Sequence, residues 1–169
     1  MSIPTLKIRQ AKISDAAQLF NMFQTNLLEP DLFISDPDKL DYIAAEEAKN
    51  IKEHRKGDNL YLVAILDKQI VGSIILTVGD YRKNCHSGSF GISIRKEFRH
   101  QGIGTKLMTE LIKWAKEHKL KRIELEVWAN NPGAINLYKK FEFTIEGIKR
   151  KAYKVKNKFI DSYLMSRLF

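Results

Sequence analysis

The residues with the clearest chemical potential form the pattern R-x-x-G-x-G-T, which runs from Arg99 through Gly102 and Gly104 to Thr105. The two glycines allow a tight turn and a close approach of the backbone to a ligand. A helical pattern begins at once behind them, so unpaired N–H groups and the positive end of the helix dipole converge on one place. Arg99 adds a fixed positive charge and a fork of donors suited to phosphate oxygens. This stretch therefore predicts a phosphate cradle.

Two better-known phosphate loops do not fit this stretch. A dinucleotide fingerprint requires a third glycine at position 107, which is occupied by Leu107. A P-loop has the pattern G-x-x-x-x-G-K-[ST], whereas Gly102 and Gly104 are separated by Ile103 alone. The cradle therefore belongs to another class of anion-binding loop.

The glycine loop resembles the acetyl-CoA pyrophosphate loop of the GNAT superfamily of N-acetyltransferases, because it follows an apolar strand that ends in Ile-Ser-Ile. A second segment, from Asn131 to Phe143, looks like the N-x-x-A-x-x-x-Y helix of that family and the strand after it. The resemblance implies transfer of the acetyl group of acetyl-CoA directly to a primary amine, within a ternary complex and without a covalent intermediate. The acceptor implied is a small molecule such as an amino acid, or a peptide or protein.

The resemblance also implies a path for acetyl-CoA between the strand ending at Ile94 and the strand ending at Trp128, which splay apart in the family. The backbone N–H of Ile92 or Ile94 would then polarise the thioester carbonyl, while both side chains belong to the core. Asn131 either hydrogen-bonds the pantetheine amides or caps its helix, and both roles can hold together. The cofactor-binding residues implied are Ile92, Ile94, Arg99, His100, Gln101, Gly102, Ile103, Gly104, Thr105, Asn131, Ala134 and Lys140.

Tyr138 is the expected general acid, on the strength of the family match. When the amine attacks the thioester, the CoA thiolate leaves and benefits from a nearby proton donor or hydrogen bond. A phenol with an ordinary pKa of about 10 is still protonated at neutral pH. The alternative is a core aromatic residue, because Ala134, Tyr138 and Phe141 share one face of the expected helix.

The acceptor amine arrives mostly as an ammonium ion, so a general base is useful. Family members often place a carboxylate in the strand before the glycine loop, where this chain has Ser89. Glu126 on the neighbouring strand is the next candidate, although an outward glutamate on a strand is usually just solvated. Deprotonation relayed by water is the open alternative.

Acidic residues between the first two helices lie on the acceptor side in family members. Here we expect Glu29 and Asp31 to attract a cationic amine. The competing interpretation is that both are helix-cap or loop carboxylates.

The hydrophobic pattern predicts elements in the order β, α, α, β, β, β, α, β, α, β, β. Strands are expected at residues 6–9, 60–66, 70–78, 90–94, 123–128, 143–154 and 159–168, and helices from Ser14 or Asp15 to near Pro30, from Asp36-Pro37 to Gly57, and over 102–118 and 131–141. Glu142 occupies the position where the family usually has a helix-ending glycine. If the backbone of Glu142 is left-handed, its side chain should lower the stability of the fold by about 1 kcal/mol.

This order predicts an α/β (α+β) fold with one GNAT-like domain over residues 1–169. The central sheet is expected to be mixed and mostly antiparallel, with about seven strands flanked by about four helices. The strand, glycine loop, helix and following strand form one βαβ crossover, which places the loop where such sheets hold ligands.

The net charge of +9 is distributed unevenly. Residues 1–81 hold 9 Lys/Arg against 12 Asp/Glu, whereas residues 82–169 hold 20 against 8. A basic field around the glycine loop would concentrate a polyanion such as CoA, although many of these lysines belong to solvated faces. A nucleic-acid binder and a CoA-binding regulatory domain without catalysis are the two rival classes.

The remaining features predict a cytoplasmic protein without a metal, acting as a monomer or homodimer with no nucleic-acid or membrane partner. Cys85 is the single cysteine and cannot form an internal disulfide, and the four histidines show no ligand spacing. The apolar runs are strand-sized and far below the roughly 20 residues that a bilayer crossing needs. No secretion signal is recognisable at the N-terminus.

Overall fold

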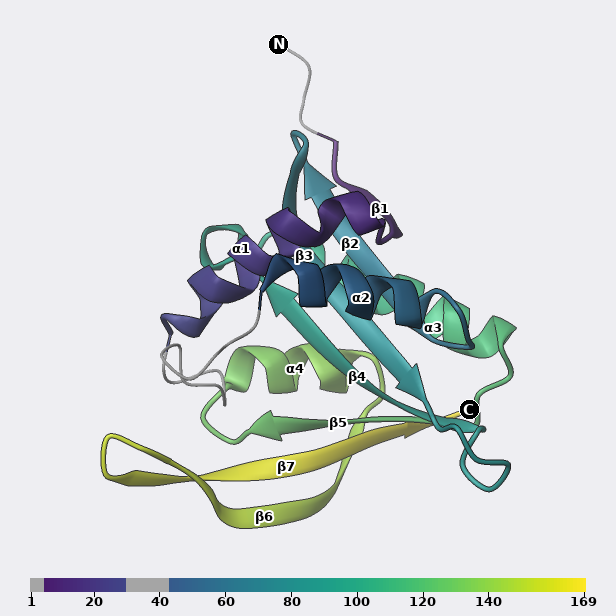
Figure 1. Cartoon of the computed structure of the whole chain (residues 1–169). Coiled ribbons are helices and arrows are strands. Elements are labelled where there is room, and N and C mark those ends of the chain that lie inside the picture. The colour runs from purple at the N-terminus through teal and green to yellow at the C-terminus, as the bar shows by residue number, and fades with distance from the viewer. Residues whose placement is uncertain (1–4, 30–42) are drawn as a thin grey trace.

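The computed structural model describes residues 5–29 and 43–169. Its strands form one mixed sheet in the order β1-β2-β3-β4-β5-β7-β6, in which β4 and β5 are parallel and the other neighbours antiparallel. The strands are β1 (Lys7–Gln10), β2 (Leu60–Leu66), β3 (Gln69–Val78), β4 (Ser87–Ile94), β5 (Arg122–Trp128), β6 (Thr144–Val155) and β7 (Lys158–Leu168). The helices are α1 (Ala16–Leu27), α2 (Ala44–His54), α3 (Ile103–Glu117) and α4 (Pro132–Lys140), with short 3-10 turns η1 (Ile13–Asp15) and η3 (Lys96–Phe98). The predicted fold class and element order are confirmed (Figure 1).

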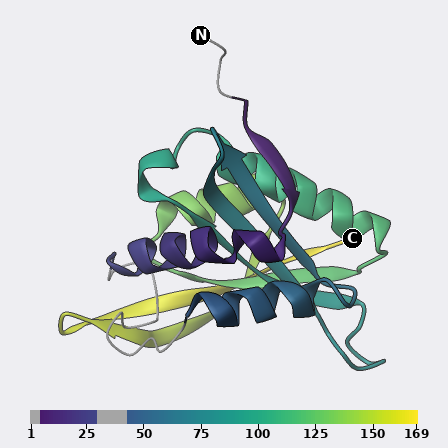
Figure 2. The ribbon, with the colours of Figure 1, turned by 45° about the horizontal axis from the view of Figure 1, so that its top comes forward.

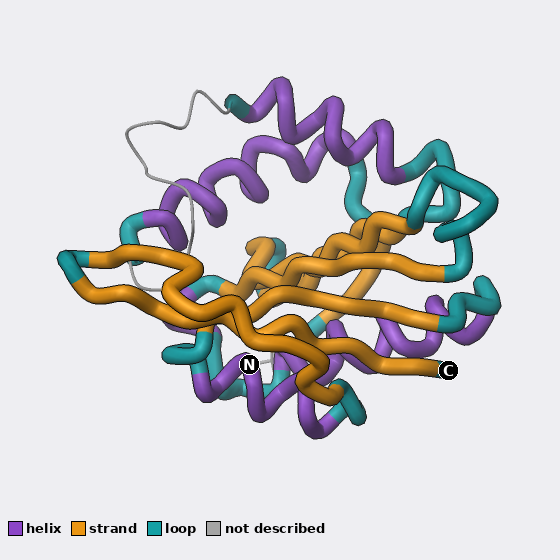
Figure 3. The backbone as a smooth tube through the Cα atoms, turned by 90° about the horizontal axis from the view of Figure 1, so that it is seen from below, coloured by secondary structure: helices purple, strands orange, loops and turns teal. Residues whose placement is uncertain are grey.

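The molecule has three layers, with α1 and α2 on one face of the sheet and α3 and α4 on the other (Figure 3). The helices α1 and α2 contact β3 and β2, respectively. A view with the top of the molecule turned forward shows the same two helices in front of the sheet and the α3 helix behind it (Figure 2). The β6–β7 hairpin extends beyond the body of the molecule at its far edge (Figure 1).

The larger core lies between the sheet and α3. Leu107, Met108 and Leu111 are fully buried there because apolar residues recur at helical spacing along α3. The matching face of β5 carries Ile123 and Leu125, whose alternation with polar neighbours gives the strand one buried side. The opposite face of β5 carries Glu124, Glu126 and Trp128, as the sequence predicts.

The smaller core lies under α1 and α2. Leu19 and Met22 of α1 and Ile51 of α2 pack with Tyr61 and Val63 of β2, all of them buried. This core anchors α1, whose C-terminal end reaches the end of β4.

Several boundaries differ from the sequence-based expectation. Ile43 is extended and caps α2, so the helix begins at Ala44; residues 36–42, where the pattern placed its start, lie outside the described residues. The strand β4 begins at Ser87 rather than at residue 90. The β2–β3 turn is tighter than predicted, with Asp67 and Lys68 both at positive φ, as in two-residue hairpin turns.

Candidate active site

The glycine loop ends in an open helix N-terminus. Gly102 is the N-cap of α3 with φ +79°, a left-handed conformation that suits glycine, and it supplies no side-chain cap. The N–H groups of Ile103, Gly104 and Thr105 therefore lack partners within the helix. A Cβ at Gly102 would meet no atom within 4 Å, so the space in front of the loop is open. These features fit the diphosphate of a CoA carrier.

Gly104 and Gly133 show how closely α3, α4 and the loop approach one another. A Cβ at Gly104 would lie 3.0 Å from Leu137 of α4 and 3.3 Å from Ile94 of β4. A Cβ at Gly133 would lie 3.9 Å from the His100 ring, so the loop lies beside the N-terminus of α4. Two helix N-termini thus lie close to the same loop.

Asn131 caps α4, as one of its two expected roles requires. Its side-chain oxygen accepts a hydrogen bond from the N–H of Ala134 at 3.1 Å, and Pro132 occupies the first helical turn. Ala134 packs against the larger core, while Lys140 is exposed at the far end of the helix. In the loop, the Gln101 amide donates to the backbone oxygen of Glu97 at 3.0 Å.

The strands β4 and β5 pair over a short stretch only. They share three register pairs, the last of which joins Ser89 to Glu124. Beyond that pair, β4 continues to Ile94 and β5 to Trp128 without pairing to each other. The strands therefore separate at the level where the resemblance implies the thioester.

Backbone donors of β4 point toward this separation. The N–H of Arg95 donates to the Val71 oxygen of β3 at 2.9 Å, which makes this a hydrogen-bonded antiparallel pair. Alternation along the strand then turns the backbone groups of Ile92 and Ile94 away from β3, toward the side of β5. This orientation is the one that an oxyanion donor in the gap requires.

Tyr138 lies where β4 leaves β5. Its ring packs edge-on against Phe90, the first residue of β4 after the paired stretch, with ring centroids 5.8 Å apart, and also contacts Phe143. The residue is 6% exposed, and burial raises the pKa of its phenol well above the ordinary value. The core-aromatic interpretation is therefore correct for the ring, and the phenol keeps its proton throughout the neutral range.

Glu126 accepts hydrogen bonds from three side chains of β6 and β7. Lys149 Nζ lies 2.5 Å, Ser162 Oγ 2.6 Å and Tyr153 Oη 2.8 Å from its oxygens. Burial raises the pKa of Glu126. The hydrogen bonds from Lys149, Ser162 and Tyr153 together lower this pKa by a larger amount, so the net pKa is lowered. A carboxylate held in this way suits binding of a cation better than uptake of a proton.

Trp128 and Tyr153 complete this cluster. Their rings are stacked with centroids 4.9 Å apart, and Trp128 is nearly buried. Burial and the Glu126 carboxylate raise the pKa of Tyr153 to about 12. Sequence reasoning placed Trp128 and Glu126 on one face but missed Lys149, Tyr153 and Ser162. Strand alternation could not have found Tyr153, because the register of β6 against β7 shifts between Lys149 and Tyr153.

Arg99 and Glu29 contact each other. The two terminal nitrogens of Arg99 donate to the two oxygens of Glu29 at 2.9 and 2.7 Å, and its Nε donates to the Ile94 oxygen at 3.1 Å. The sequence assigned these side chains to two different ligands, CoA and the acceptor, whereas the structure brings them together. Both roles remain predictions. Asp31, the other expected acceptor-binding residue, lies outside the described residues.

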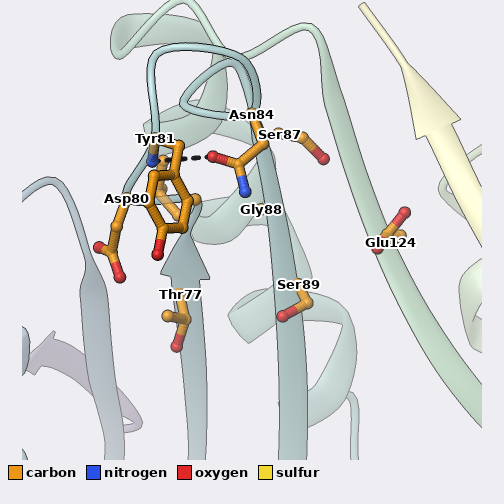
Figure 4. Close-up of a pocket in the computed structure, with 10 residues that line it drawn as sticks. Thr77, Asp80, Tyr81, Asn84, Ser87, Gly88, Ser89 and Glu124 are labelled. Carbon is orange, nitrogen blue, oxygen red and sulfur yellow. Dashed lines mark hydrogen bonds between the residues drawn. The ribbon is translucent and has the colours of Figure 1, made fainter.

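A pocket of about 350 Å³ lies at the opposite end of β4 from the glycine loop. Thr77, Ser89 and Glu124 line it from three neighbouring strands, and Tyr81 and Asn84 of the β3–β4 loop form its rim (Figure 4). Glu124 shares a face of β5 with Glu126, so this pocket lies on the same side of the sheet as the Glu126 cluster.

Comparison with known proteins decides the family. The model of the acetyltransferase (GNAT) family matches residues 19–143. The chain belongs to this family. It is 35% identical over 109 residues to the L-amino acid N-acetyltransferase AaaT of Escherichia coli, covering 63% of this chain and 67% of that protein.

Solved GNAT structures have the same fold over nearly the whole chain. An acetyltransferase from Streptococcus pneumoniae superposes with a TM-score of 0.91 at 32% identity, covering 98% of this chain and 99% of that chain. A phosphinothricin acetyltransferase from Sinorhizobium meliloti, solved with acetyl-CoA, gives a TM-score of 0.87 at 17% identity over 98% and 89% of the two chains, and so shares the fold. The chain is an acetyl-CoA-dependent N-acetyltransferase.

Two further observations concern groups other than acetyl-CoA. Over residues 5–29 and 43–169, no three His, Cys, Asp or Glu side chains gather as a metal site would require. Within the same ranges, no helix is long and apolar enough to cross a membrane.

Proposed function

We propose that this GNAT enzyme acetylates a primary amine of an amino acid or of a peptide, with acetyl-CoA bound along the gap between β4 and β5. The observation that carries the proposal is that three features occur along the part of β4 that is separated from β5. These are the uncapped N-terminus of α3, the separation of β4 from β5, and the buried phenol of Tyr138. The curated relative that acts on L-amino acids supports the acceptor class.

Each residue then has a defined task. The N–H groups of Ile103, Gly104 and Thr105 hold the diphosphate, with the positive end of α3 behind them. A backbone N–H of Ile92 or Ile94 stabilises the oxyanion that forms when the amine attacks the thioester carbon.

The bonds and protons balance as follows. The C–N bond forms, the C–S bond breaks, and the bonding electrons leave with the sulfur of CoA. The ammonium loses one proton before attack and the nitrogen loses a second as the amide forms; one of the two ends on the thiol and the other is released to solvent. The ordinary pKa of a phenol, about 10, is already above that of a thiol, about 8.5, and burial of Tyr138 raises its pKa further. This phenol therefore donates a hydrogen bond to the departing sulfur and remains protonated.

The deciding experiment is a screen of amino acids, peptides and simple amines with acetyl-CoA, measured as free thiol. We expect thiol release that depends on both substrates. The Tyr138→Phe variant should lose about 10- to 100-fold in kcat, because it removes the hydrogen bond to the leaving group. Its fold should be retained, since the ring packing against Phe90 and Phe143 is unchanged.

The control is the binding of acetyl-CoA, measured by calorimetry on the wild type and on Tyr138→Phe. Equal affinities with unequal kcat values would assign Tyr138 to the chemical step. Tight acetyl-CoA binding without thiol release from any amine would contradict the proposal and indicate a binding domain.

A further inference from the structure

The Glu126–Lys149 ion pair lies beside the proposed reaction centre. Glu126 is two residues beyond Glu124, the last residue of β5 that pairs with β4, so it borders the separated part of the strands. It also lies on the face of β5 opposite α3, because Ile123, Leu125 and Val127 turn toward that helix. On the path that the proposed function gives to acetyl-CoA, a thioester entering the gap from the α3 side would present its carbonyl carbon toward the Glu126 face.

The two partners of this ion pair differ in how firmly they are held. Glu126 is fixed from beneath by the hydroxyl of Ser162, which is fully buried, and from the side by Tyr153, whose ring stacks on Trp128. The side chain of Lys149 is 52% exposed, and within residues 5–29 and 43–169 its one hydrogen-bonded or ion-pair partner is Glu126. An exposed ion pair contributes little to stability, so the ammonium of Lys149 can move away at small cost.

The surroundings of the pair are strongly basic. Residues 149–158 include Lys149, Arg150, Lys151, Lys154, Lys156 and Lys158 and no acidic residue. All six are exposed on the β6–β7 hairpin. This field repels an acceptor that carries only positive charge, such as a polyamine, and attracts one that also carries a carboxylate. The fixed carboxylate of Glu126 still provides one place for an ammonium.

We propose that Glu126 and Lys149 form the recognition site for the zwitterionic head of a free α-amino acid. The acceptor's ammonium takes the place of Lys149 on Glu126, and the displaced Lys149 binds the acceptor's carboxylate. The inference rests on the proposed function and narrows its acceptor to molecules in which the amine and the carboxylate share one carbon. Glu126 orients the amine, and Lys149 is the residue that selects for the carboxylate.

The test compares each amino acid with its α-amide, which keeps the amine and removes the carboxylate charge. The wild type should favour the amino acid over its amide by about tenfold in kcat/KM. Lys149→Met should raise KM for the amino acid by about tenfold while leaving KM for the amide unchanged or lower. Glu126→Gln should raise KM for both acceptors, because both carry the ammonium.

Lys154→Met is the matched control, since Lys154 lies in the same hairpin but over the Phe159 ring. It removes the same charge from the hairpin without touching Glu126. An equal loss in Lys154→Met and Lys149→Met would overturn the proposal in favour of a general effect of hairpin charge. Equal wild-type kcat/KM for the amino acid and its amide would overturn it as well.

The proposed function and this inference fail in different ways. If no amine, amide or amino acid releases thiol, the proposed function fails. If amides and simple amines are acetylated as well as amino acids, only the zwitterion site fails. Calorimetric titration of the CoA-saturated protein with an amino acid gives a readout without turnover, and Lys149→Met should weaken that binding by about tenfold.

Discussion

Arg99 connects the glycine loop to Glu29, two residues beyond the end of α1. Its guanidinium joins the carboxylate of Glu29, at the end of α1, to the carbonyl oxygen of Ile94, at the end of β4. Nearby, the Asn26 amide donates to Ser93 Oγ at 2.7 Å. These contacts hold the C-terminal end of α1 against the end of β4 and the glycine loop.

A double-mutant cycle on Arg99 and Glu29 measures this connection. Glu29→Gln removes the carboxylate partner of Arg99, and Arg99→Met leaves Glu29 with Lys96 alone, whose Nζ lies 4.0 Å away. The side chains of Arg99 and Glu29 are only 23% and 19% exposed. We expect each to lower the free energy of unfolding by about 1–2 kcal/mol, and the double variant to lose less than the sum. Urea denaturation of the four proteins gives the coupling energy. Additive losses would mean that the pair has no energetic connection.

Local signals in the sequence predicted the site residues better than distant ones. The structural roles of Gly102 and Asn131 could be predicted from the sequence, because a turn or a helix cap depends on neighbours only a few residues away. The Arg99–Glu29 contact joins residues 70 positions apart, so no spacing rule indicates it. Lys149 escaped notice for the same reason, since its partner Glu126 lies on a different strand.

At the scale of elements, α3 and α4 end in the same way. In each, the residue after the cap is left-handed, with φ +57° at Lys119 and +64° at Glu142. The N–H of the following residue donates a hydrogen bond to a carbonyl oxygen of the helix. Leu120 donates to the Ala115 oxygen, and Phe143 donates to the Tyr138 oxygen. Both ends are therefore Schellman motifs built on non-glycine residues.

Replacing Lys119 by glycine should stabilise the protein. Glycine adopts the left-handed conformation without the steric cost of a Cβ, so we expect the free energy of unfolding to rise by about 1 kcal/mol. At this chain length that corresponds to about 2–4 °C in Tm, measurable by calorimetry. Lys119 is exposed, and its side chain forms no hydrogen bond or ion pair with the part of the chain that the structure describes.

Glu142→Gly serves as the comparison for that variant. The same backbone relief is offset there by the loss of the Arg167–Glu142 ion pair, whose nitrogen and oxygen lie 2.6 Å apart. The gain should therefore be smaller than for Lys119→Gly. A larger gain would show that the ion pair contributes nothing.

The elements that the sequence predicted well are those with uninterrupted periodicity. The α3 helix and β5 agree with expectation within a residue, because one face of each is buried along its whole length. The β6–β7 hairpin was expected, but its two register shifts were not. Such irregularities depend on how the hairpin twists over β5, which a single strand's pattern does not encode.

At the scale of the whole molecule, a buried carboxylate joins α2 to the sheet. Glu47 is fully buried; its Oε1 accepts a hydrogen bond from Tyr61 of β2, and its Oε2 has no partner among the described residues. Burial raises the pKa of Glu47. The hydrogen bond from Tyr61, the nearby side chain of Asn50 and the charge of His54 lower this pKa by a smaller amount, so the net pKa is raised. The folded state thus holds a proton on Glu47 more tightly than the unfolded chain does.

Stability should therefore depend on pH through Glu47. Between the ordinary pKa of 4.5 and the raised folded value, the folded state binds more protons, so the free energy of unfolding falls as pH rises. Glu47→Gln removes this slope. We expect the Tm of the variant relative to the wild type to increase from pH 4.5 to pH 8, with Glu53→Gln, an exposed carboxylate of α2, as control. A difference that stays constant with pH would contradict this assignment.

The overall topology was predicted from the order of elements, but the place of β7 was not. The sequence suggested a closing hairpin, and the structure inserts its second strand, β7, between β5 and β6. The alternation of apolar and polar residues in the final strand fits a place either at the edge or inside the sheet. The pattern of one strand shows which of its faces is buried, but not which strands lie beside it.

The short seam between β4 and β5 divides the sheet into two leaves, one formed by β1 to β4 and the other by β5, β7 and β6. Three residue pairs of β4 and β5 join the two parts directly, and beyond these pairs the two strands do not pair with each other. On the proposed path, the extended arm of the carrier would lie along this seam like an added strand. Binding of the donor would then fill the gap between β4 and β5 and connect the two parts of the sheet.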